Sequence, residues 1–161
     1  FGTAPDESIA AAVKSMAALN KGAAVAMQEV GVNAATDVTG FGLLGHLAQM
    51  MKASGTSATL NWSAIPFLPG AIDLAHAGST SGGTRRNMEA LEGRVLYGEG
   101  ISEFEFMVLA DAQTSGGMLI SVPEERSDAL AKSLVTNETL YSEVIGRVVN
   151  DGQLGTVTIE K

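Results

Sequence analysis

The chain has 161 residues, about the length of one domain by the usual prior of roughly 100–200 residues. Its 10 Lys and Arg residues against 18 Asp and Glu residues give a formal net charge of −8. That charge excludes sequence-independent nucleic-acid binding and attachment to a membrane through basic residues, because both need a positive field.

The sequence contains no cysteine, which excludes disulfides, thiolate metal sites and a cysteine nucleophile and agrees with a cytoplasmic protein. No apolar run approaches the about 20 residues of a membrane span. Phe1-Gly2-Thr3 has neither an initiator Met nor the features of a signal peptide. We therefore expect residues 1–161 to form a single domain taken from a longer protein.

Hydrophobic periodicity predicts helices at the start of the chain. Pro5-Asp6-Glu7-Ser8 is typical of a helix start, and apolar residues follow at helical spacing: Ile9, Val13, Met16 and Leu19. Asn20-Lys21-Gly22 interrupts this helix, and an Ala-rich helix then runs to Val30, where Gly31 can end it.

The next stretch predicts a helix followed by a strand. An amphipathic stripe begins after residues 37–42 and favours a helix that ends at Gly55; its members are Leu43, Leu44, Leu47, Met50 and Met51. Residues 56–62 alternate like a strand, with Ala58, Leu60 and Trp62 on one face. The methionines Met16, Met27, Met50 and Met51 lie at helical spacing, and we interpret them as core packing.

The second half mixes both element types. We expect a short helix at 69–77, a flexible loop at 78–84, a buried strand at 118–122 and a helix at 123–135. Residues 143–149 and 156–159 resemble a terminal hairpin around Asn150-Asp151-Gly152. Because helices and strands do not alternate strictly, we predict an α+β fold with mixed α/β layers: a mixed sheet flanked by helices.

The stretch Asp37-Val38-Thr39-Gly40-Phe41-Gly42 combines a carboxylate, a glycine turn and a helix start. Glycines let a ligand approach the backbone, and a helix N-terminus favours phosphate. Asp37 could hold magnesium beside that phosphate. The alternative is that Asp37 and Thr39 only cap the helix.

Two further stretches are compatible with anion binding. In Asp111-Ala112-Gln113-Thr114-Ser115-Gly116-Gly117, hydroxyls and glycines could form an anion nest, or the hydroxyls could satisfy a tight turn. In Gly82-Gly83-Thr84-Arg85-Arg86-Asn87, Arg85 and Arg86 could clamp phosphate, or simply be exposed beside acidic residues. His46 and His76 lack a carboxylate at convincing spacing, which favours structural roles over general-base catalysis.

In this order, and together with Met16-Ala17-Ala18-Leu19-Asn20 and the continuation Leu43-Leu44-Gly45-His46-Leu47, these stretches resemble the C-terminal half of selenophosphate synthetases, also called selenide, water dikinases. The resemblance covers nearly the whole chain. It implies a fold like the C-terminal domain of the aminoimidazole ribonucleotide synthetase (PurM-like) superfamily. It also implies an enzyme that makes selenophosphate from selenide, ATP and water and releases AMP and phosphate.

By motif match, the resemblance assigns Asp37 to magnesium and Thr39, Gly40 and Gly42 to the ATP phosphates. It assigns Arg85, Arg86, Thr114 and Ser115 less firmly to the same site. The family's N-terminal domain supplies the catalytic Cys or selenocysteine, a Lys and most magnesium-binding aspartates, so we expect no catalytic residue here. The complete enzyme is expected to be a homodimer.

The chain departs from the family at Ala112, where the family usually has Pro; this loosens a turn and removes no functional group. Two alternatives stay open. One is another ATP-dependent enzyme of the same superfamily, although Phe41 between two glycines favours the selenium enzyme. The other is a non-catalytic dimerisation or ligand-binding module.

Overall fold

The structure, a computed structural model, describes residues 4–161. Phe1, Gly2 and Thr3, on which the expectation of an internal start rests, lie outside the described residues. The elements in chain order are α1 (Asp6–Ala17), α2 (Lys21–Val30), β1 (Ala34–Asp37), α3 (Gly42–Ser54), β2 (Ser57–Asn61), the 3₁₀ turn η1 (Trp62–Ala64), α4 (Ala71–His76), α5 (Thr84–Ala90), β3 (Val95–Tyr97), α6 (Glu103–Leu109), β4 (Met118–Ser121), the 3₁₀ turn η2 (Glu124–Arg126), α7 (Ser127–Thr136), β5 (Gly146–Val149) and β6 (Val157–Glu160).

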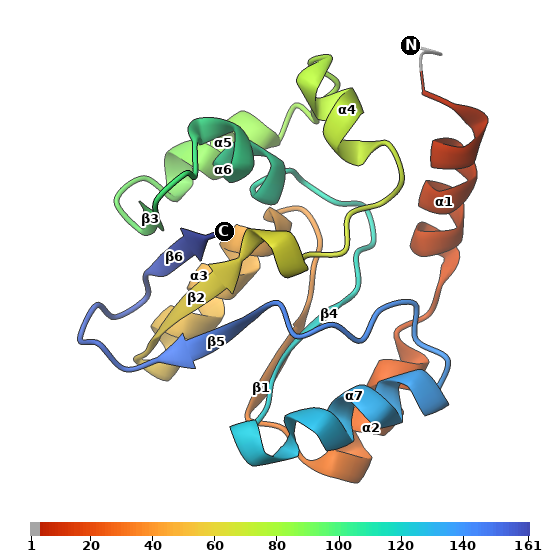
Figure 1. Cartoon of the computed structure of the whole chain (residues 1–161), viewed down its shortest axis with the longest axis vertical. Helices are drawn as coiled ribbons and strands as arrows, with labels where there is room; N and C mark the ends of the chain where they lie inside the picture. The colour runs from red at the N-terminus through yellow and green to blue at the C-terminus, as the bar shows by residue number, and fades with distance from the viewer. Residues whose placement is uncertain (1–3) are drawn as a thin grey trace.

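The main sheet has four strands in the order β3-β6-β2-β5. β2 runs parallel to β6 and antiparallel to β5, and β3 runs parallel to β6, so the sheet is mixed. α3 lies against β2 and β6 on one face of this sheet (Figure 1). The predicted mixed sheet flanked by helices is therefore confirmed.

The predicted hairpin between residues 143–149 and 156–159 is wrong, because β2 lies between β5 and β6. The loop that joins them is bonded to the start of β2 instead of closing a two-stranded turn. The hydroxyl of Ser57 donates to Asp151 Oδ1 at 2.6 Å, and the N–H of Gly155 donates to the carbonyl of Thr56 at 2.7 Å. β2 thus lies in the middle of the sheet, and its Ala58 and Leu60 are buried in the core beneath α3.

α3 supplies most of the main core, as its apolar stripe predicts. Leu44, Leu47 and Met51 are each at most 4% exposed and pack with the buried face of β2 and β6. Gly55 ends the helix in the left-handed conformation, with φ of 64°. Fully burying one such side chain contributes about 1.5–3 kcal/mol, so this helix is firmly held on the sheet.

A second, smaller core joins α2 and α7. Ala26 and Leu130 are buried there, and Met118 and Ile120 of β4 pack against it. β4 pairs antiparallel with β1 in a separate two-stranded ribbon, whose opposite face contacts the main core through Leu119. The ribbon runs from the α2–α7 pair toward the sheet (Figure 1). Because it is covered less completely than a central strand, β4 is half-buried, not buried as predicted.

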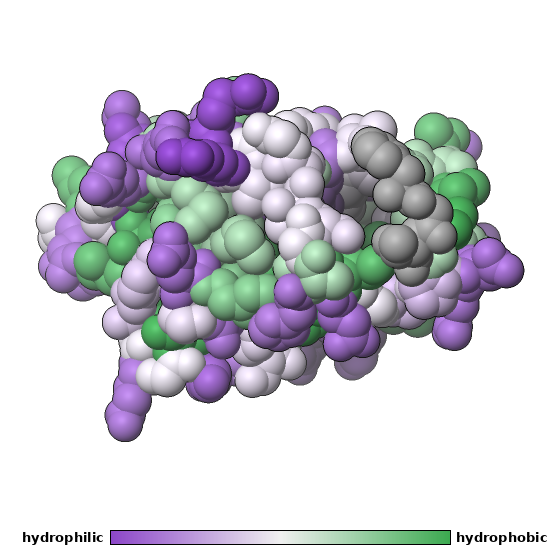
Figure 2. All heavy atoms as spheres, turned by 90° about the horizontal axis from the view of Figure 1, so that it is seen from above, coloured by the Kyte–Doolittle hydropathy of each residue, from purple (hydrophilic) through white to green (hydrophobic). Residues whose placement is uncertain are grey.

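α1 forms where the sequence predicts a helix, but it buries none of its residues. Ile9, Val13 and Met16 remain 44–56% exposed. The interpretation of Met16 as core packing is therefore wrong, whereas Met50 and Met51 are buried. Viewed from above, hydrophobic residues are visible at the right-hand side, where α1 lies (Figure 2). Among residues 4–161, no helix combines the length and apolar character that crossing a bilayer requires.

Candidate functional site

The candidate site begins where β1 ends. Asp37 is the last residue of β1, is exposed, and pairs in register with Met118, the first residue of β4. Because the two strands are antiparallel, the stretch that follows β1 and the stretch that precedes β4 lie at the same end of the ribbon. Pairing of the ribbon thus brings residues 37–42 and 111–117 together.

Backbone hydrogen bonds lock these two stretches to each other. The N–H of Val38 donates to the carbonyl of Gly117 at 3.0 Å, and the N–H of Gly116 donates to the carbonyl of Val38 at 2.8 Å. One residue further, the N–H of Gln113 donates to the carbonyl of Thr39 at 3.1 Å. Thr114, which is exposed, and Ser115, which is half-buried, lie between these bonds.

The two glycines of the turn have different environments. Gly42 has φ of +68°, and a Cβ there would lie 2.7 Å from the carbonyl carbon and oxygen of Ala110. Gly42 therefore lets the start of α3 press against the end of α6. Gly40 is exposed, and a Cβ there would meet no atom within 4 Å. Of these two glycines, Gly40 is the one with open space beside it.

His46 is buried near the start of α3 and bonds to Thr39 in the loop that precedes this helix. The N–H of Thr39 donates to His46 Nε2 at 3.0 Å, and the Thr39 hydroxyl lies 3.2 Å from the same nitrogen. Because a backbone N–H can only donate, Nε2 accepts, which places the ring proton on Nδ1. His46 thus has a structural contact of the kind favoured from sequence. His76 stacks on Phe104 with ring centroids 3.8 Å apart.

The alternative interpretation of Asp37 and Thr39 as helix caps is wrong. The N-cap of α3 is Phe41, and no side chain makes a capping hydrogen bond there. The Asp37 carboxylate is exposed at the end of its strand. Among the described residues no group of three or more His, Cys, Asp or Glu side chains could hold a metal ion.

Two of the candidate residues lie on the outer surface of α5. Arg85 forms a salt bridge with Glu89 one turn later, with Nε and Oε1 3.1 Å apart and side chains 90% and 64% exposed. This ion pair is the alternative arrangement expected from the sequence, in which the arginines are simply exposed beside acidic residues. Arg86 is also exposed.

Asn87, on the same helix, makes a connection that sequence reasoning missed. Its Nδ2 donates to the carbonyl of Gly40 and to the carbonyl of Ala110, both at 2.9 Å. The signal available in the sequence was an Asn that follows the glycines and arginines of residues 82–86. Residues 82–87 are thereby bonded to residues 37–42 and to the end of α6, directly before residues 111–117.

Asp111, also missed, fixes α5 from the other side. Its Oδ1 accepts from the N–H of Ser81 at 3.1 Å and from the hydroxyl of Thr84, which is 3% exposed. The hydroxyls of Ser81 and Thr84 lie 3.0 Å apart. The glycine-rich loop before α5 is therefore held against the end of α6.

The chain is similar to known proteins over most of its length. Residues 3–159 match the family model "AIR synthase related protein, C-terminal domain". The chain is 42% identical over 147 residues to "Selenide, water dikinase 2" of Peptoclostridium acidaminophilum, covering 91% of this chain and 42% of that protein. It is 43% identical over 145 residues to "Selenide, water dikinase" of Caldanaerobacter subterraneus subsp. tengcongensis, covering 89% of this chain and 42% of that protein.

The chain thus spans about 42% of the length of these curated relatives. Among solved structures, hydrogenase maturation protein HypE in complex with ATP aligns with a TM-score of 0.51 and 20% identity over 82% of this chain and 33% of that chain. At that identity the likeness concerns the fold alone. The resemblance inferred from the motifs is confirmed, and the chain belongs to the family of AIR synthase related proteins, as their C-terminal domain.

Proposed function

We propose that this chain is the C-terminal domain of a selenophosphate synthetase, which makes selenophosphate from selenide, ATP and water and releases AMP and phosphate. The observation that carries the proposal is the convergence of the three motif stretches on the Thr39–Gly42 turn through Gln113 and Asn87. The relatives named selenide, water dikinase, which match about nine-tenths of this chain, support the same activity.

Asp37 is the proposed magnesium ligand. Its carboxylate is exposed at the end of β1, next to the glycine turn. Magnesium commonly takes one or two protein carboxylates and completes its coordination with phosphate oxygens and water. A single carboxylate beside a phosphate site fits that donor set, and an N-terminal domain would supply the remaining carboxylates.

The ATP phosphates would lie along the turn that precedes α3. Gly40 leaves room for close approach, and the N-terminus of α3 carries the positive end of the helix dipole. Thr39, Thr114 and Ser115 are the other proposed contacts on this side. Gly42 contributes indirectly, because its N–H donates to the carbonyl of Thr39 at 3.0 Å and so closes the turn. Arg85 and Arg86 would approach from α5. Releasing Arg85 from Glu89 costs little, because exposed ion pairs are worth about 0–1 kcal/mol.

The chemistry itself is assigned to the N-terminal domain of the longer enzyme, a cytoplasmic homodimer in this proposal. The isolated chain then binds magnesium and ATP only in the millimolar range, about −4 kcal/mol, because part of the phosphate and metal contacts is absent. Calorimetric titration measures this affinity. Micromolar binding would mean that the chain holds a complete nucleotide site by itself.

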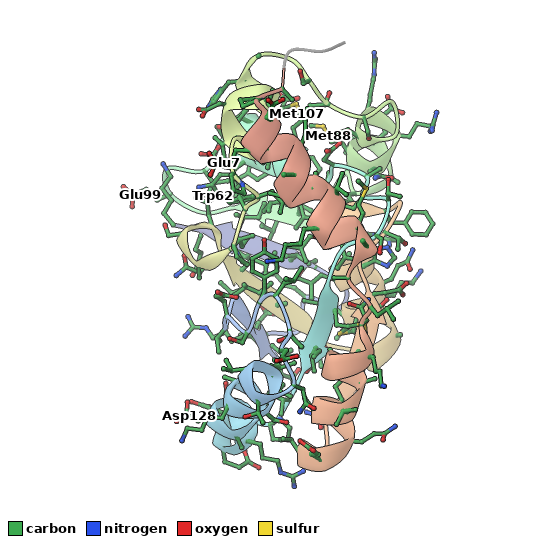
Figure 3. The ribbon with its side chains drawn as sticks, turned by 90° about the vertical axis from the view of Figure 1, so that its right-hand side faces the viewer. Glu7, Trp62, Met88, Glu99, Met107 and Asp128 are labelled. Carbon is green, nitrogen blue, oxygen red and sulfur yellow. The ribbon has the colours of Figure 1, made fainter. Side chains whose placement is uncertain are left out.

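The deciding experiment compares two variants in the full-length protein that carries this chain. Asp37→Asn keeps the side-chain volume and removes the charge that magnesium prefers, so AMP release with selenide should fall to background while thermal unfolding changes little. Asp128→Asn is the matched control. Asp128 is exposed on α7, at the opposite end of the molecule from Met88, the neighbour of Asn87 (Figure 3).

The outcomes separate the candidate functions. Near-normal AMP release by Asp37→Asn would remove Asp37 from the metal site. ATP turnover by the unmutated protein that does not depend on selenide would favour another ATP-dependent enzyme of the superfamily. No nucleotide turnover at all would favour a non-catalytic dimerisation or ligand-binding module.

A further inference from the structure

The side-chain amide of Asn87 donates two hydrogen bonds, both to main-chain carbonyls. One carbonyl belongs to Gly40 in the turn before α3, and the other belongs to Ala110 at the end of α6. An amide nitrogen carries two donors, so both are used here. The side chain therefore ties two backbone segments, 70 positions apart in the sequence, to a third element.

The helix that carries Asn87 is itself held in place. Asp111 accepts from the N–H of Ser81 and from the hydroxyl of Thr84, which begins α5. The N–H of Asn87 donates to the carbonyl of Gly83 at 3.0 Å, as expected of the first turn of a helix. Asn87 is thus anchored from the loop side and can fix the carbonyls that it contacts.

The bond to Gly40 also sets the direction of the next amide. The peptide group between Gly40 and Phe41 is planar and trans, so the Gly40 carbonyl and the Phe41 N–H point in opposite directions. Asn87 draws the carbonyl toward α5 and thereby turns the Phe41 N–H away from α5. Phe41 is 54% exposed, and Gly40 beside it has open space. An anion could therefore reach this N–H.

We propose that Asn87 is a positioning residue that aims the Phe41 N–H at a phosphate group of ATP. The proposal rests on the proposed function, because it assumes that the turn lies along the triphosphate. Asn87 does not touch the nucleotide and acts through the Gly40–Phe41 peptide. Losing a hydrogen bond to a charged group of this kind weakens binding about 10- to 100-fold.

Asn87→Asp is the sharpest variant because it preserves shape and removes both donors. Its carboxylate would face two carbonyl oxygens and repel them. Asn61→Asp is the matched control, since the Asn61 side chain accepts from the N–H of Ser63 at 2.9 Å and a carboxylate accepts equally well. Asn87→Ala removes the donors without adding charge, and it carries the test if Asn87→Asp does not fold.

Steady-state kinetics of the full-length protein form the first readout. Asn87→Asp should raise the KM for ATP about 10- to 100-fold and leave the KM for selenide unchanged, whereas Asn61→Asp should change neither. A purely structural role would lower the folded fraction, which reduces kcat and leaves both KM values unchanged. That result, or an unchanged KM for ATP, would overturn the proposal.

Amide NMR spectra of the isolated chain form the second readout and do not depend on enzymatic activity. Asn87→Asp should shift the resonances of residues 39–42 and 110–113 and leave those of β2 and β6 in place. Unchanged resonances at residues 39–42 would overturn the proposal. If the unmutated full-length protein releases no AMP, the proposed function has failed, and the NMR result alone decides whether Asn87 orients the turn.

Discussion

Replacing Gly42 by alanine tests whether the start of α3 needs a glycine for structural reasons. Gly42 has φ of +68°, a conformation that costs a non-glycine residue about 1–2 kcal/mol. The new Cβ would also lie 2.7 Å from the carbonyl carbon and oxygen of Ala110, where ordinary contacts are 3.4–4 Å. Either α3 or the end of α6 would have to move.

The two costs add to a measurable loss. Overpacking of this kind typically costs about 1–3 kcal/mol. The reduced entropy of the unfolded chain returns about 0.4–1 kcal/mol. The net destabilisation is therefore about 1–5 kcal/mol, which corresponds to a melting temperature about 2–18 °C lower for a domain of this size. Gly40→Ala is the matched control, because its Cβ would meet nothing within 4 Å.

Thermal and urea unfolding of the isolated chain, followed by circular dichroism, measure both variants. We expect Gly40→Ala to unfold within about 1 kcal/mol of the unmodified chain, since only the flexibility of one exposed residue changes. If Gly42→Ala melted at the unmodified temperature, or lost no more than Gly40→Ala, the close contact between the start of α3 and Ala110 would not exist as described.

Two further substitutions test the core and one helix start. Leu44 is completely buried, so Leu44→Ala should lower the free energy of unfolding by about 2.7–5 kcal/mol in urea titrations. The control Leu154→Ala, at a residue that is 65% exposed, should change this free energy by less than about 0.5 kcal/mol. Equal losses in the two variants would contradict the assigned core. Ser102→Ala removes the capping box of α6 and should cost about 1 kcal/mol near neutral pH. The Ser102 hydrogen bonds hold the pKa of Glu105 below its ordinary value of 4.5, so this stabilisation is present above that value and is lost as the pH falls through the lower pKa of the folded state. The difference between the unmodified chain and Ser102→Ala should therefore shrink as unfolding is measured at increasingly acidic pH below 4.5, and a difference that did not depend on pH would refute the role of Glu105.

Local elements of the fold could be predicted because their signals lie within a few residues. The apolar stripe that contains Leu44 and Met51, followed by Gly55, predicts α3 and its end, and the structure has both. The same holds for α1 and α2, although the break between them lies at residues 18–20 and not at Asn20-Lys21-Gly22, because Lys21 and Gly22 already belong to α2. Helical periodicity and the left-handed preference of glycine are properties of neighbouring residues, so no tertiary information is needed to read them.

Strand pairing and the joining of the motifs could not be predicted in this way. An alternating pattern tells which face of a strand is buried but not which strand lies beside it, so β5 and β6 look like a hairpin until β2 is seen between them. Met16 has helical spacing whether or not a partner covers it, and nothing in residues 4–161 buries it.

The sequence by itself therefore determined the helices α1, α2, α3, α4 and α7, the three motif stretches and the family to which they belong, because each depends on residue types at short spacing. It did not predict α5 and α6. Only the tertiary structure decided that Asn87 bonds to Gly40 and Ala110, that Asp111 holds Thr84, and that Gly42 serves packing while Gly40 stays open. These contacts join residues 23–47 positions apart. Such contacts form only when the packing of α3, α5 and α6 brings their ends together, and no local pattern records that packing.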